Sequence, residues 1–175
     1  MWLITVIPRV FQFLFAIIVL GLSVSLAKGQ VIGSVPATTG YGSFTGGLGI
    51  LAAIVGFAAL LTDFLEGIIS WAIDGLACVA FLAGGIAFAV GLRGTDCSDI
   101  NTTWNNAILS GGCDANGCDY FGGDIDHIEQ TVKSRCTSAK ADAAFMFLGF
   151  IFCMFVIAGS MFFSQNKRNR SGAVV

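Results

Sequence analysis

Residues 68–92 read IISWAIDGLACVAFLAGGIAFAVGL, an apolar run that contains one carboxylate, Asp74. A helix needs roughly 20 mostly apolar residues to cross a bilayer, and this run is long enough to do so. Three further stretches qualify, at residues 10–27, 42–61 and 143–163, and none of them contains a charged residue. The sequence therefore predicts an all-α integral membrane protein with a bundle of four spanning helices.

The composition supports this class and excludes others. The chain has 175 residues, of which 55% are apolar and 11% charged, and its mean hydropathy is +0.82. Soluble domains carry about 25% charged residues, so this chain has too few to coat a water-facing surface. Disordered chains have low hydrophobicity and high charge, which this chain lacks. Its net charge of −2 gives no basic field for nucleic acid.

The two ends of the chain indicate its orientation. We expect the first stretch to be kept as a span and not cleaved as a signal peptide, because Arg9 is the only early positive charge. Residues 1–9 are predicted to be a cytosolic or interfacial N-terminus, and residues 164–175 a basic cytosolic tail. The basic residues of that tail favour cytosolic termini, and they are also candidates for contact with anionic lipid headgroups. These residues are Lys167, Arg168 and Arg170.

The loop between the third and fourth spans, residues 93–140, is predicted to be a 48-residue extracytosolic segment. It holds four of the six cysteines, which are Cys97, Cys113, Cys118 and Cys136. Such a cluster is typical of disulfides in an oxidising compartment, although a metal site and free thiols are the alternatives. Of the three possible pairings we favour Cys97 with Cys136 and Cys113 with Cys118, because the outer two flank the membrane ends of the spans.

The same loop carries two further signals. Asn101 begins an Asn-Thr-Thr glycosylation sequon. Residues 124–134 place apolar side chains along one side and are predicted to form a short helix.

Small residues recur at intervals of three and four on the second and third spans, which places each set on one face of its helix. On the second span these are Gly42, Gly46, Gly49, Ala53 and Gly56, and on the third Ala77, Ala80, Gly84, Ala87 and Gly91. Small residues let helix backbones approach closely in lipid. We favour packing of the two stripes within one protomer, with contact to a second protomer as the alternative.

Asp74 is the single acid within the predicted spans, and it lies roughly along the small-residue face of the third span. A carboxylate at membrane depth is costly and is often functional. Because no predicted span contains a basic partner, we favour a structural role in which Asp74 holds helices together by hydrogen bonds. A proton or ion pathway is the alternative.

Several short motifs occur in a fixed order along residues 10–163. They are Phe13-Leu14-Phe15 with Gly21-Leu22, Asp74 early in the third span, Val90-Gly91-Leu92-Arg93 leading to Cys97, and Ser134-Arg135-Cys136 leading through Ala139, Ala141, Ala143 and Ala144 into an aromatic fourth span. With four spans and a longer last loop, this order resembles the MARVEL tetraspan superfamily. It is most similar to the fungal MARVEL proteins of the non-classical export protein family.

The resemblance implies a non-enzymatic membrane organiser of the plasma membrane that self-associates into homo-oligomers. It implies roles in eisosome or furrow organisation, in the response to sphingolipids and in unconventional export. Membrane lipids and other membrane-domain proteins are the implied partners, with bound lipids in place of a cofactor. Cys97 and Cys136 match the family's arrangement, whereas Cys113 and Cys118 look like an addition in this chain.

Two other functions compete with this interpretation. A small channel or transporter would use Asp74, but few other polar residues are available near the middle of the spans. A thiol oxidoreductase would use Cys113 and Cys118, but the acids around them raise the pKa of a thiol, whereas a reactive pair needs a lowered one. Because the sequence contains no recognisable catalytic motif and no set of metal ligands, we predict that the protein is not an enzyme.

Overall fold

The computed structural model describes residues 2–31, 33–61, 68–112 and 125–171. Within these ranges the chain forms the helices α1 (Trp2–Lys28), α2 (Ala37–Leu61), α3 (Ile68–Gly91), α4 (Ile100–Trp104) and α5 (Ile125–Ser171). Four of them contain segments long and apolar enough to cross a membrane, namely Val6–Lys28, Ala37–Ala59, Ser70–Gly91 and Glu129–Phe162. The predicted all-α architecture with four spans is therefore confirmed.

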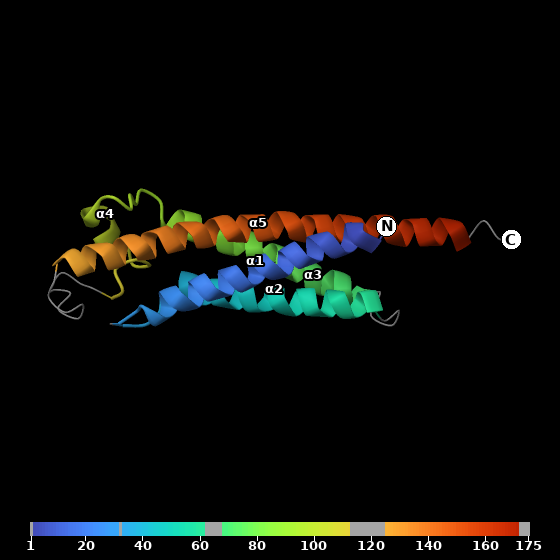
Figure 1. The fold of residues 1–175 in the computed structure, drawn as a ribbon, viewed down its shortest axis with the longest axis horizontal. Coiled ribbons are helices and arrows are strands. Elements are labelled where there is room, and N and C mark those ends of the chain that lie inside the picture. The colour runs from blue at the N-terminus through green and yellow to red at the C-terminus, as the bar shows by residue number, and fades with distance from the viewer. Residues whose placement is uncertain (1, 32, 62–67, 113–124, 172–175) are drawn as a thin grey trace.

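The long helices lie lengthwise beside one another and form an elongated bundle (Figure 1). α1 packs against α2 and α5, and α3 packs against the same two helices, so α1 and α3 occupy opposite corners. α4 lies beside the N-terminal part of α5, away from the end at which α1 begins (Figure 1). The bundle thus has an end that holds the start of α1 and the end of α5, and an opposite end that holds α4.

Two helices are longer than the sequence indicates. α1 begins at Trp2 and continues through Pro8, so residues that we expected to form a separate N-terminal segment belong to the first helix. α5 begins at Ile125, so the predicted short helix at 124–134 is its first part, and the predicted loop 93–140 ends much earlier than expected. Near both helix starts a charged side chain is buried by a contact distant in sequence, Arg9 with Asp74 of α3 and Arg135 with carbonyl oxygens of the segment after α4.

Phe81 of α3 lies at the centre of the bundle and is fully buried. Its ring fits between two glycines, because a methyl group added at Gly49 of α2 or at Gly149 of α5 would stand 2.7 or 2.9 Å from ring carbon atoms. With Ala16, Val19, Phe88 and Met146 it forms the apolar core. Large side chains opposite glycines bring helices close together, so dispersion contacts stabilise the bundle in lipid.

The closest approach between α1 and α2 predicts opposite effects for two adjacent glycines. A Cβ atom at Gly46 would stand 2.6–2.8 Å from the backbone of Leu20, whereas nothing lies within 4 Å of one at Gly47. We expect Gly46→Ala to lower the free energy of unfolding by about 1–3 kcal/mol through overpacking. Gly47→Ala is expected to leave it unchanged or to raise it by up to about 1 kcal/mol, because alanine favours helix more than glycine does. Denaturant unfolding of both variants in the same lipid mimic tests this, and equal effects would contradict it.

Candidate functional site

A buried ion pair joins opposite corners of the bundle near the end where α1 begins. Arg9 of α1 donates from Nη1 to Oδ1 of Asp74 at 2.9 Å and from Nη2 to Oδ2 at 2.7 Å. The two side chains are only 4% and 2% exposed. The expectation that Asp74 has no basic partner is therefore wrong, because α1 starts early enough to bring Arg9 inside. A planar guanidinium suits this bidentate contact with a carboxylate.

The second helix is shaped around the guanidinium group. Arg9 also lies 3.4 Å from the carbonyl oxygen of Ala52 on α2, as a donor through Nη1. Gly56, one turn further along α2, faces the same group so closely that any Cβ atom there would overlap Nη1 and the guanidinium carbon. Gly56 therefore makes the room in which Arg9 crosses the bundle from α1 to α3.

One turn further into the bundle, two more polar residues are buried. Gln12 of α1 donates from Nε2 to Sγ of Cys153 on α5 at 3.1 Å. Its other amide atom, Oε1, has no hydrogen-bond partner, and the same is true of Nε of Arg9. Together with the ion pair, these side chains form a buried polar layer that consists of Arg9, Gln12, Asp74 and Cys153.

A second polar contact lies toward the opposite end of the bundle. Ser23 of α1 donates from Oγ to Oδ2 of Asp142 on α5 at 2.5 Å, and both residues are fully buried. Fourteen residues of helix separate Ser23 from Arg9, which corresponds to about 21 Å along α1. The bundle therefore has a polar contact toward each end with the apolar core between them.

Arg135 of α5 fastens the segment after α4 to the bundle. It donates from Nε to the carbonyl oxygen of Leu109 at 2.9 Å and from Nη2 to that of Ile108 at 3.2 Å. Its guanidinium lies so close to Gly29, just beyond α1, that a Cβ atom there would overlap Nη1 unless Arg135 moved. These hydrogen bonds to carbonyl oxygens allow the charged side chain of Arg135 to be buried against the bundle.

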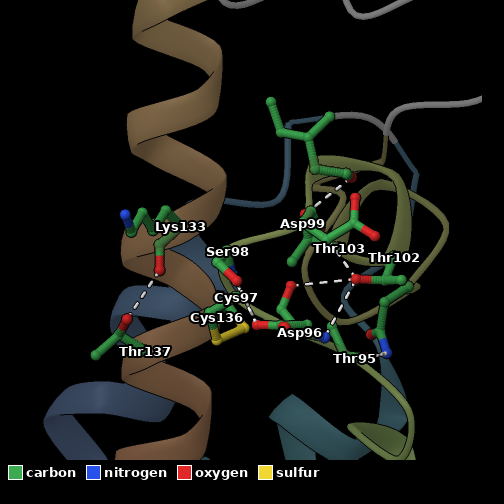
Figure 2. Close-up of a disulfide and its surroundings, with 12 residues drawn as sticks. Thr95, Asp96, Cys97, Ser98, Asp99, Thr102, Thr103, Lys133, Cys136 and Thr137 are labelled. Atoms are coloured by element: carbon green, nitrogen blue, oxygen red, sulfur yellow. Dashed lines mark hydrogen bonds between the residues drawn. A yellow bond between two sulfur atoms is a disulfide. The ribbon is translucent and has the colours of Figure 1, made fainter.

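A disulfide between Cys97 and Cys136 covalently joins this segment to α5, with the Cα atoms 5.5 Å apart (Figure 2). The predicted pairing of these two cysteines is confirmed. Beside it, the backbone N–H and the hydroxyl of Ser98 donate to Asp96 at 3.0 and 2.8 Å, and these hydrogen bonds lower the pKa of that exposed carboxyl group. Asn106 donates to the carbonyl oxygen of Gly91 at 2.7 Å and so caps the end of α3.

The small residues that the sequence singles out lie inside the bundle. All five positions of the second-span stripe are buried, as are the first three of the third-span stripe, while Ala87 and Gly91 are half-buried. Gly42, Gly46 and Gly49 face side chains or backbone of α1, α3 and α5. Within the protomer, the stripes therefore serve helix packing.

For six other predicted site residues, either the whole residue or its side chain lies outside the described part of the structure. Cys113 and Cys118 lie outside the described residues, so their predicted pairing stays a prediction. Asn101 lies in α4, and Lys167, Arg168 and Arg170 lie in the last turns of α5, but the side chains of all four are outside the described part.

This geometry decides what Asp74 can do. Both of its carboxylate oxygens accept hydrogen bonds from Arg9, so the carboxylate is neutralised by a charge that is buried with it. The bidentate contact joins α1 to α3 and supports the structural role predicted for Asp74. The proton or ion pathway stays the alternative.

Sequence reasoning missed Arg9, Ser23 and Asp142 as members of the buried polar contacts. A signal for Arg9 was present, since a single arginine at the start of an apolar run and a single acid in another run are natural partners. Asp142 lies between the predicted loop and the predicted fourth span, so the sequence pattern gives it no role in either.

Comparison with protein families matches residues 2–159 to the family model MARVEL, described as a membrane-associating domain. Comparison with curated proteins and with solved structures gives no significant match.

Proposed function

Because the chain belongs to the MARVEL family of membrane-associating domains, we propose that it organises membranes without catalysing a reaction, by lateral association with lipids and with its own copies. One observation carries this proposal most directly. Within residues 9–23, 39–59, 70–90 and 142–159, the charged side chains and Gln12 are buried between helices, whereas the large side chains that face outward are apolar. Such a protein presents its surroundings with an outer surface suited to lipid chains and to other membrane helices.

The finer proposal concerns place and orientation. We propose that the protein acts in plasma-membrane domains of the fungal eisosome or furrow type, with links to the sphingolipid response and to unconventional export, as the motif resemblance implies. Both termini would be cytosolic and the segment after α3 extracytosolic. The Cys97–Cys136 disulfide supports this orientation, because disulfides persist in oxidising compartments. Lys167, Arg168 and Arg170 would then meet anionic headgroups of the cytosolic leaflet.

Self-association must use the outer surface, because the small-residue stripes are occupied within the protomer. α3 has an outer face with aliphatic side chains in steps of three and four and small residues at two positions. Its exposed members are Ala72, Leu76, Val79, Ala83, Ile86 and Val90. Without a projecting aromatic ring, this face allows a second helix to approach closely.

Native mass spectrometry of protein released with its surrounding lipids tests the proposal. We expect a defined homo-oligomer that retains lipids, and a lipid-poor monomer would contradict the organiser function. Val79→Trp on the outer face of α3 is expected to shift the population toward monomer. Leu14→Trp on the outer face of α1 is the matched control, because Leu14 is also exposed. An equal loss of oligomer in both variants would show that the α3 face is not the contact.

A further inference from the structure

Asp142 differs from Asp74 in its surroundings, although both acids are buried. Asp142 is fully buried, one carboxyl oxygen accepts from Ser23, and the other, Oδ1, has no hydrogen-bond partner. Asp74 forms an ion pair with Arg9, whereas no cation among the described residues forms an ion pair with Asp142. A bare carboxylate in such a place would be an uncompensated charge, which is far more costly than an unpaired hydroxyl group.

The charged and titratable side chains near this level of the bundle do not compensate Asp142. On α5, Arg135 is engaged with the carbonyl oxygens of Ile108 and Leu109, and Lys140 is exposed. Lys28 at the end of α1 and Arg93 beyond α3 are also exposed, and the phenol of Tyr41 on α2 carries no positive charge. Each exposed cation keeps its hydration, so it gives little stabilisation to a dry carboxylate.

We propose that Asp142 is a proton-binding site and carries its proton in the folded protein at neutral pH. The proton resides on the carboxyl group, with Oδ2 accepting from Ser23, and it makes the contact between α1 and α5 electrically neutral. The Ser23–Asp142 hydrogen bond then holds α1 and α5 together only while Asp142 is protonated. Loss of the proton would leave a negative charge between them and drive water or a cation into the bundle.

The two buried acids thus have opposite electrostatic surroundings. Asp74 contacts the Arg9 guanidinium that is buried with it, whereas the described partner of Asp142 is a hydroxyl group. Asparagine resembles a neutral aspartic acid in size and polarity, so it should replace Asp142 with little loss. It cannot replace the charge of Asp74.

Infrared spectroscopy of the protein in lipid nanodiscs at neutral pH measures this directly. We expect the carbonyl stretching band of a protonated carboxylic acid in the wild type, its loss in Asp142→Asn, and its retention in Asp74→Asn. Ser23→Ala removes the hydrogen bond to Oδ2 and is expected to shift the band without abolishing it. Absence of the band in the wild type, or its persistence in Asp142→Asn, would overturn the proposal.

Stability against pH gives a second measurement. Because the carboxyl group of the unfolded chain ionises at about pH 4, the thermal stability of the wild type falls as pH rises from about 4 through neutral, until Asp142 in the folded protein has lost its proton. Asp142→Asn removes this proton and is expected to lose less stability over the same pH range. An identical decline in both proteins would contradict the assignment, even if the variant were less stable throughout.

Discussion

Asp74→Asn is expected to lower the free energy of unfolding by about 3–5 kcal/mol, the usual cost of removing one partner of a buried ion pair. The substitution keeps the size of the side chain but leaves the Arg9 guanidinium buried without a counter-charge. Arg9 cannot reach water without moving the start of α1 away from α2 and α3. Unfolding in a lipid mimic, followed by denaturant titration, measures the loss.

Two further variants separate charge from packing. Replacing both partners, as in Arg9→Met with Asp74→Leu, is expected to recover most of the lost stability, because no uncompensated charge remains. Asp96→Asn is the control for a general effect of removing an acid, since Asp96 is exposed outside the spans. If Asp74→Asn were no more harmful than Asp96→Asn, the ion pair would not hold the bundle together.

The second large effect concerns the disulfide. Replacing Cys97 and Cys136 together with alanine is expected to cost roughly 2–4 kcal/mol, because the bond closes a loop across a sequence separation of 39 residues. The loss should appear as a lower free energy of unfolding under non-reducing conditions. The segment after α3 would remain attached through Arg135, the Asn106 cap and the buried side chains of Ile108 and Leu109.

A reducing agent provides the matched test of this effect. It should lower the stability of the wild type by a similar amount and should change the double variant much less. Any remaining effect of the reductant on the double variant would report on Cys113 and Cys118. Equal stability of wild type and double variant without reductant would show that the bond adds nothing to the fold.

The spans and the disulfide were predictable because each depends on a feature that is local or nearly so. Four apolar runs each satisfy the length that a bilayer requires, and Cys97 and Cys136 directly flank the membrane ends of two of them. The internal use of the small-residue stripes was also the favoured interpretation, since helices in lipid approach through small residues.

The starts of α1 and α5 were not predictable in the same way. Hydropathy treats Arg9, Arg135 and Asp142 as reasons to end a span, because an unpaired charge is costly there. In the structure, each one contacts a group distant in sequence: Asp74 lies 65 residues from Arg9, and Ser23 lies 119 residues from Asp142. Such pairings exist only after the helices pack, so no window along the chain contains both partners.

The continuity of α5 has a mechanical consequence. Its 47 residues correspond to about 70 Å of unbroken helix, whereas a bilayer with its headgroups is about 40–45 Å thick. Cys136 ties the N-terminal part of this helix to the segment after α3, and its last turns carry the basic residues of the opposite end. A stiff lever of this length converts a tilt of about 10° into a displacement of about 12 Å between its tips.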